Sequence, residues 1–79
     1  MKAKRVHELN KSAIDTIVFT ITEYKDKPIF DIRLETTTMS GEKVFTPKGI
    51  AMAIERLPEF AEGVSKLLAE AKEMGLLNE

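Results

Sequence analysis

The sequence lacks cysteine and tryptophan, and it has one histidine and one tyrosine among its 79 residues. Without cysteine the chain has no disulfide framework, no thiol nucleophile and no zinc-thiolate site, which excludes a small secreted protein held by bridges. A chain of this length forms one domain with a modest core, close to the size at which a monomer becomes marginally stable. These features indicate a reducing, cytoplasmic location and make a homodimer an early expectation.

Long hydrophobic runs are also missing. The longest uninterrupted apolar run, Ile50 to Ile54, is far shorter than the roughly 18 residues that a membrane span needs. The first residues carry charge but no apolar h-region of the kind found in signal peptides. We therefore expect a soluble protein that is not exported and has no membrane partner.

The pattern of polar residues offers no catalytic or metal site. His7 is the only histidine and lies in a polar stretch, where a histidine is usually a solvated side chain. No glycine-rich phosphate loop is present, and Asp15, Asp26 and Asp31 are not spaced as a catalytic carboxylate pair. The sequence predicts that the protein is not an enzyme and needs no cofactor and no metal.

The charge is divided unevenly between the two parts of the chain. The formal net charge is -1, yet residues 1–49 hold nine Lys or Arg against seven Asp or Glu, and residues 50–79 hold three against six. An unevenly charged, solvated surface accounts for a difference of this size. Net charge alone is therefore no argument for a nucleic-acid partner.

Two strand-like runs between Thr16 and Glu35 dominate the sequence. Apolar residues alternate with polar ones in both runs, as expected for strands with one buried and one wet face. The first run places Ile17, Phe19 and Ile21 on the face expected to be core, and Thr16, Val18, Thr20, Thr22 and Tyr24 on the other. The second run places Phe30, Ile32 and Leu34 on its apolar side. A turn at Tyr24 to Pro28 joins them into an antiparallel pair.

The flanking segments are shorter and less regular. Residues 1–13 read as a basic arm or a short edge strand around Val6, and residues 14–79 as a single domain of sheet and helix. A third short strand, Lys43 to Thr46, is expected to end at Pro47. Gly49 can adopt backbone angles closed to other residues or allow a close backbone approach, so the chain is expected to bend sharply there. Either Val44 with Thr46 or Lys43 with Phe45 could face the core, so the strand register stays open here.

From about Glu55 the apolar period changes to that of an amphipathic helix. Its apolar stripe is expected to cover the sheet and to leave a surplus for a second copy: Leu57, Phe60, Ala61, Val64, Leu67, Leu68 and Ala71. Pro58 fits only in the first turn, and Gly75 is a natural stop. Gly63 lies inside the helix, where glycine costs about 0.5 to 1 kcal/mol relative to alanine. We therefore expect close packing at Gly63.

The order of short motifs resembles a known family. The motifs are Glu23-Tyr24-Lys25-x-Lys27, Asp31-Ile32-Arg33, Gly41-Glu42 and Lys48-Gly49-Ile50, followed by the amphipathic helix. From about Ile17 to Leu68 they resemble the C-terminal domain of the eukaryotic transcriptional coactivator positive cofactor four and its small bacterial relatives. The resemblance implies an α+β fold, a strongly curved antiparallel sheet of three to four strands followed by one C-terminal helix. It also implies a homodimer through the helices, with grooves for single-stranded DNA.

The resemblance also implies roles for individual residues. In that family an aromatic residue of the first hairpin stacks on a base, and Tyr24 matches it. The lysine of the Lys-Gly-Ile segment contacts the nucleic-acid backbone and matches Lys48, while the family's Asp-Ile-Arg arginine matches Arg33. The full set of candidate nucleic-acid-binding residues is Tyr24, Lys25, Lys27, Arg33, Lys43 and Lys48.

Two positions depart from the family pattern. A tryptophan of the coactivator is replaced by Thr36, and a further lysine aligns near Val44, with Lys43 beside it. These departures bear on affinity and on base preference.

The residues alone leave two functions open. An aromatic face beside cations suits unpaired nucleic acid. Tyr24, with Lys25 and Lys27 in the same turn, supplies both, although a tyrosine can equally pack on a neighbouring strand. We expect a homodimer that binds single-stranded DNA, or RNA, with low sequence specificity, in transcription, replication or repair. The alternative is a dimeric protein-interaction module that uses the open sheet face.

Overall fold

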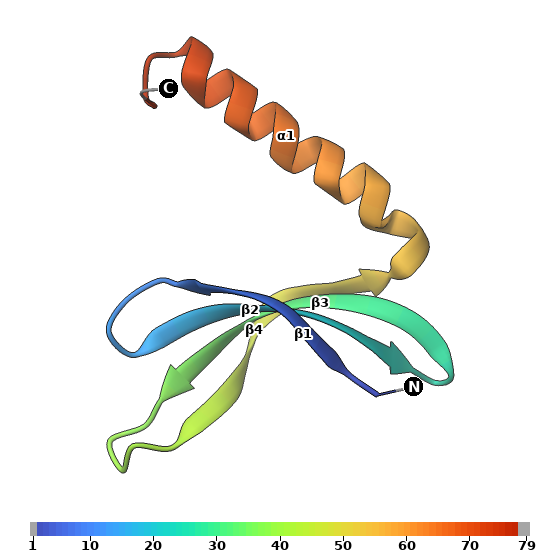
Figure 1. Ribbon diagram of the computed structural model, residues 1–79, viewed down its shortest axis with the longest axis vertical. Helices are drawn as coiled ribbons and strands as arrows, with labels where there is room; N and C mark the ends of the chain where they lie inside the picture. Colours follow the sequence, from blue (N-terminus) through green and yellow to red (C-terminus); the bar gives the residue numbers. More distant parts are fainter. Residues whose placement is uncertain (1, 78–79) are drawn as a thin grey trace.

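The structure, a computed structural model, describes residues 2–77 and contains one sheet and one long helix (Figure 1). The elements are β1 (Lys4–Asn10), β2 (Asp15–Tyr24), β3 (Lys27–Thr37), β4 (Lys43–Ala53), a 3-10 turn η1 (Ile54–Arg56) and α1 (Leu57–Glu73). The strands are antiparallel and lie in the order β1-β2-β3-β4. The α+β fold, an antiparallel sheet followed by one C-terminal helix, is confirmed.

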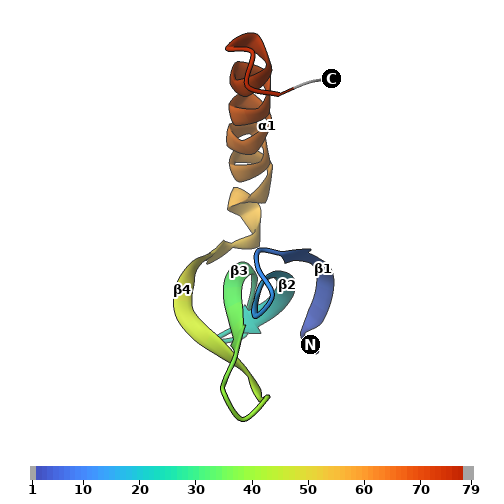
Figure 2. The same cartoon turned by 90° about the vertical axis from the view of Figure 1, so that its left-hand side faces the viewer.

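The sheet is strongly curved. Seen from its end it forms an arch, with β1 and β4 on the two sides, β2 and β3 between them, and α1 standing above it (Figure 2). The curvature brings the two edge strands into contact, because Arg5 on β1 lies 5.8 Å from the ring centre of Phe45 on β4. We call the side on which these two residues meet the inner face.

The β2–β3 hairpin closes through two residues with left-handed backbone angles. Lys25 has φ of 51° and Asp26 has φ of 65°, as a type I′ turn requires, and its twist matches that of the flanking strands. Tyr24 and Lys27 pair across the turn. Pro28 precedes the first β3–β4 pair, Ile29 with Ala53, so its missing N–H costs that ladder nothing.

β4 continues through Pro47, so the prediction that the strand ends there is wrong. The ladder shifts between Arg33 and Glu35, and Pro47 is tolerated because it lies in this irregularity on an edge strand. The Thr46 hydroxyl donates to the Leu34 carbonyl over 3.0 Å. The close approach expected at Gly49 is confirmed, since an added Cβ would lie 2.5 Å from the Ile32 carbonyl oxygen.

The pairing of β3 with β4 settles the open register. Phe45 lies opposite Glu35 and Lys43 opposite Thr37, so Lys43 and Phe45 share the inner face. Val44 lies opposite Thr36 on the other side.

The two faces of the sheet are buried unequally. The inner face includes Val18, which is completely buried, and Glu35, which is 7% exposed. The opposite side, which we call the apolar face, consists of Ile17, Phe19, Ile21, Phe30, Ile32 and Leu34. Only Phe30 is buried there, and the others are half-buried. The expectation that Ile17, Phe19 and Ile21 form the core while Val18 lies on the wet face is therefore wrong within the chain.

Helix α1 begins and ends where the sequence predicts. Pro58 lies in the first turn and Met74 caps the C-terminus. Gly75 follows with φ of 76°, and the Gly75 and Leu76 amides donate to the carbonyls of Lys72 and Ala71 over 3.0 and 2.9 Å. This pair of hydrogen bonds is a Schellman motif, which satisfies carbonyls that the helix end leaves free.

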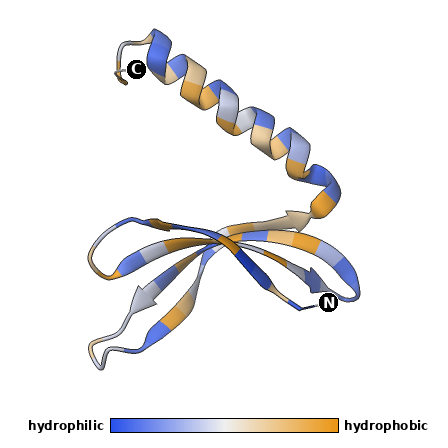
Figure 3. Cartoon of the chain, viewed as in Figure 1, coloured by the Kyte–Doolittle hydropathy of each residue, from blue (hydrophilic) through white to orange (hydrophobic). Residues whose placement is uncertain are grey.

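Most of α1 stands clear of the sheet, so the expectation that its stripe covers the sheet of its own chain is wrong. Its contact with β3 is near its start, where the rings of Phe60 and Phe30 lie 5.4 Å apart. Hydrophobic segments recur along the rest of the helix (Figure 3), and Val64 and Leu67 are 51% and 73% exposed. The close packing expected at Gly63 is also wrong within the chain, because an added Cβ would meet nothing within 4 Å.

Within residues 2–77, no helix combines the length and the apolar character that crossing a membrane requires.

Candidate nucleic-acid interface

The tip of the β2–β3 hairpin brings three of the six candidate residues together. Tyr24 ends β2 and is 64% exposed, and the Lys25 ammonium lies 5.4 Å from the centre of its ring. Lys27 pairs with Tyr24 across the turn. Because type I′ geometry defines the backbone of the short loop, the ring and both cations project from the same turn. This tip can offer an aromatic face and positive charge to the same ligand.

Arg33 is occupied by partners within the sheet. Its Nε and Nη2 donate to the Asp31 carboxylate over 2.9 to 3.2 Å, and its Nη1 donates to the Thr46 carbonyl at 3.3 Å. The hydrogen bonds to Asp31 raise the pKa of Arg33 above its ordinary value. The guanidinium therefore ties β3 to the irregular part of β4, and a phosphate would have to compete with Asp31 for it.

A second ion pair crosses the inner face. Arg5 on β1 donates to Glu35 on β3 over 3.2 and 3.4 Å and to Glu8 over 3.1 Å. The hydrogen bond to Glu35 is the main reason that the pKa of Arg5 is raised above its ordinary value. Val18 lies on this same face and has no exposed surface. The middle of the inner face is therefore filled by the protein's own charged side chains.

The remaining two candidates lie apart from the hairpin tip. Lys43 begins β4 at the far end of β3, opposite Thr37. Lys48 lines a hollow of about 370 Å³, and the other charged residues around it are Arg33, Asp15 and Lys11 from the β1–β2 loop. The apolar residues around this hollow are Ile17, Ile32, Leu34 and Ile50. The six residues thus fall into a compact group at the tip, Arg33 and Lys48 at one hollow with Arg33 paired to Asp31, and Lys43 by itself.

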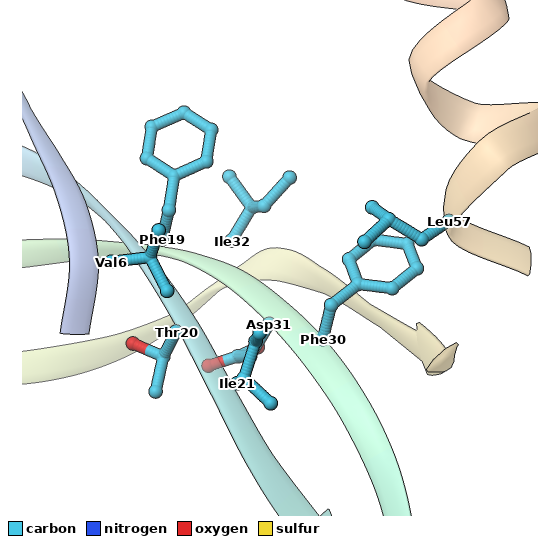
Figure 4. A pocket seen from close by; sticks show the side chains of 8 residues that line it. All are labelled: Val6, Phe19, Thr20, Ile21, Phe30, Asp31, Ile32 and Leu57. Carbon is cyan, nitrogen blue, oxygen red and sulfur yellow. The ribbon is translucent and has the colours of Figure 1, made fainter. Parts of the chain in front are cut away.

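A smaller hollow of about 160 Å³ separates the apolar face from the start of the helix (Figure 4). Phe19, Ile32 and Phe30 point toward the same side of the sheet, and Leu57 reaches toward Phe30 from the helix (Figure 4). The side chains around this hollow are mostly apolar, so it suits hydrocarbon rather than phosphate. It belongs to the uncovered apolar face.

Sequence reasoning missed three residues at these surfaces. Arg5 and Lys11 were seen only as members of a basic segment, and Phe45 only as a strand residue. The basic segment itself was a weak signal for the first two. No local pattern identifies Phe45, because its place opposite Glu35 depends on strand pairing across an irregular ladder.

One of three comparisons with known proteins supports the family that the order of motifs indicates. No family model matches the chain, and no curated protein matches it. Among solved structures the chain is similar to BPSL1147, a PC4 homologue from Burkholderia pseudomallei K96243, at 29% identity.

Two crystal forms of BPSL1147 give nearly the same result. The TM-score is 0.72 for the orthorhombic form and 0.73 for the tetragonal form. The alignments cover 87% of this chain and 90% or 98% of the other. Together with the order of motifs in the sequence, these likenesses support a bacterial PC4-like family for this chain.

Proposed function

We propose that the protein binds single-stranded DNA as a homodimer, with low sequence specificity. The observation that carries the proposal is the likeness to a PC4 homologue over 87% of the chain, combined with the exposed Tyr24 at the hairpin tip. The tip matches the aromatic position that the family resemblance implies. The same resemblance suggests that the protein acts in transcription, replication or repair.

The chemistry of the tip favours unpaired nucleic acid over duplex. An exposed ring offers a stacking surface to any base, and nearby lysines neutralise phosphates regardless of sequence. Bases in a duplex are already stacked and paired, so they cannot splay out to meet Tyr24. The acidic neighbours Glu23 and Asp26 oppose phosphate binding, so we expect modest affinity.

The homodimer is supported by the amount of uncovered apolar surface. Leu67 and Leu68 on α1 are 73% and 49% exposed, and Ile50 on β4 is 47% exposed. Two buried hydrophobic residues, Val18 and Phe30, make up the core of residues 2–77, which is too small to stabilise a chain of this size. A second copy that packs its helix against this one would cover the stripe.

The test of DNA binding is fluorescence anisotropy with labelled oligo-dT, oligo-U and a duplex at two salt concentrations. We expect oligo-dT to bind more tightly than duplex. Tyr24→Ala should cost roughly 1 to 3 kcal/mol of binding free energy with little change in salt dependence. Tyr24→Phe keeps the ring and serves as the control. Equal, weak binding to single strand and duplex that survives Tyr24→Ala would contradict the proposal.

Lys48 provides an independent test of phosphate contact. If it neutralises one phosphate, Lys48→Ala weakens binding to all sequences and flattens the slope of log affinity against log salt by about 0.7. Glu55→Ala, at an exposed position outside the candidate residues, is a control for altered surface charge. An unchanged slope in Lys48→Ala would remove this residue from the interface.

Sedimentation velocity tests the dimer. We expect a dimer at micromolar concentration, and Leu67→Glu should dissociate it because a carboxylate would be buried between the helices. Lys66→Glu places the same charge at a neighbouring exposed position and serves as the control. A wild-type protein that sediments as a monomer would refute the dimer.

The half-exposed apolar face favours a second candidate, a dimeric module that binds another protein through its sheet. Salt dependence separates the two functions, because an apolar protein interface does not weaken steeply with salt as phosphate contacts do.

A further inference from the structure

A second exposed aromatic ring lies on the same face of the sheet as Tyr24. Phe45 on β4 is 53% exposed and lies opposite Glu35 on β3, while Tyr24 lies opposite Lys27 on the same strand. Lys27 and Glu35 are eight residues apart, which corresponds to about 26 Å along an extended strand. One face therefore carries aromatic rings near both of its ends.

The Phe45 ring is held in place from one side. The Arg5 guanidinium carbon lies over it at 5.8 Å from the ring centre, and Arg5 is itself fixed by hydrogen bonds to Glu35 and Glu8. A guanidinium over one side of an aromatic ring is a favourable cation–π arrangement. More than half of Phe45 is still exposed to solvent, so Arg5 leaves much of the side chain open to a ligand.

We propose that Phe45, backed by Arg5, is a second stacking site that takes an unpaired nucleobase of the same single strand. The proposal rests on the proposed function and extends it from one aromatic contact to two. Phe45 binds the base directly, and Arg5 is a positioning residue because it acts through the ring. Lys43 lies two residues before Phe45 on the same face, where its ammonium can meet a neighbouring phosphate.

The chemistry of this position selects a base rather than a free anion. The guanidinium at the ring, that of Arg5, is already paired with two carboxylates, Glu35 and Glu8, so an anion gains little there. A stacked base needs a flat apolar face and no free charge, and this is what the ring offers. Because the contact is a π-face, it should accept any base.

The test measures anisotropy of labelled oligo-dT with Phe45→Leu and Phe45→Tyr. Phe45→Leu keeps an apolar side chain but removes the flat ring, so we expect the dissociation constant to rise about 5- to 150-fold. Phe45→Tyr keeps the ring and should bind as the wild type does. Val44→Ala lies on the same strand with its side chain on the opposite face and should also leave binding unchanged. Circular dichroism and sedimentation confirm that each variant keeps its fold and oligomeric state.

An oligonucleotide of the same length with abasic sites in place of bases gives the decisive comparison. A stacking role predicts that Phe45→Leu weakens binding to oligo-dT but has no effect on the abasic strand. Equal losses on both strands, or no loss on oligo-dT, would overturn the proposal. A loss that is accompanied by a change in oligomeric state would overturn it as well, because Phe45 would then serve the protein interface.

The outcome separates this inference from the proposed function. If wild-type protein does not bind oligo-dT, the proposed function fails and the second site fails with it. If wild-type protein binds and Tyr24→Ala weakens binding while Phe45→Leu does not, the function stands and the second stacking site alone is refuted.

Discussion

The two faces of the sheet reverse the usual relation between polarity and burial. The inner face carries threonines, carboxylates and guanidiniums, yet it contains Val18, the one side chain among residues 2–77 that has no exposed surface. The apolar face carries isoleucines and phenylalanines, yet most of it is only half-buried.

The curvature of the sheet explains the difference. It closes the inner face by letting side chains from β1 reach across to β3 and β4. The apolar face lacks a cover because α1 leaves the sheet after its first turn. Burial within this chain therefore follows the shape of the sheet rather than the composition of its faces.

The largest effect is expected where β4 meets β3 on the inner face. In Gly49→Ala the new Cβ would lie 2.5 Å from the Ile32 carbonyl oxygen and 2.9 Å from the Arg33 Cα. Both atoms belong to the backbone and cannot move aside cheaply, so we expect a loss of about 3 kcal/mol or more of unfolding free energy. Urea denaturation measures it. A loss below about 1 kcal/mol would show that the strands can separate here without cost.

The next effect compares one residue from each face, the buried Val18 and the half-buried Phe19. Val18→Ala should cost about 2 to 3 kcal/mol of unfolding free energy, because it empties a fully enclosed site. Phe19→Ala removes a half-buried ring from the apolar face and should shift the concentration at which the dimer dissociates. Val18→Ala should leave that concentration unchanged. Denaturation and sedimentation across a dilution series test the two variants. If both shifted the dissociation of the dimer equally, the two faces would not differ in their contribution to the dimer.

A smaller effect is expected from the ion pair that spans the inner face. The coupling free energy between Arg5 and Glu35 in a double-mutant cycle with alanine should be about 1 kcal/mol, because Glu35 is shielded while Arg5 is 45% exposed and screened by water. The exposed helix pair Arg56 and Glu59 is the control, with about 0.3 kcal/mol expected. Equal couplings would show that the inner face gives the pair no protection.

The same pair has a defined pH dependence on its basic side. The pKa of Arg5 is raised, mainly by its hydrogen bond to Glu35, so its contribution is present below the ordinary arginine pKa and is lost only as pH rises through the higher folded value. The coupling should therefore be the same at about pH 7 and at about pH 9. A decline of the coupling free energy between about pH 7 and about pH 9 would mean that a group other than Arg5 is responsible for it.

The smallest effect is expected at Gly63. An added Cβ meets nothing within 4 Å in the chain, so Gly63→Ala should raise the unfolding free energy by up to about 1 kcal/mol through helix propensity. Thermal melting gives the sign. A clear loss would indicate that another surface, such as that of a second copy, packs against this position.

Local patterns were sufficient for β2, β3 and α1, but not for the extent of β1 and β4. Alternation identified β2 and β3, Pro58 and Gly75 bounded α1, and the order of short motifs pointed to the family whose fold the structure shares. These signals work because each depends on residues close together in the sequence. The exposed position of Tyr24 at the end of its strand was within their reach as well.

Longer-range features lay beyond those patterns. Pro47 normally ends a strand, and only the irregular ladder beside it lets β4 continue. The burial of Val18 depends on curvature that brings Arg5 to Phe45, two residues forty positions apart. A period-two pattern assigns residues to faces, but it does not say which face closes on itself.

The irregular ladder at Pro47 also governs how this sheet behaves in a crowded solution. β4 is one outer edge of the sheet, and an exposed edge can recruit strands from other molecules and seed fibres. Pro47 has no N–H to offer an incoming strand, and the shifted register beside it breaks the regular spacing that a template requires. β1, the other edge, has its own register shift between Arg5 and His7 and carries charged residues. Both edges are therefore poor templates for the addition of further strands. We expect this to limit aggregation of a chain with so much uncovered apolar surface.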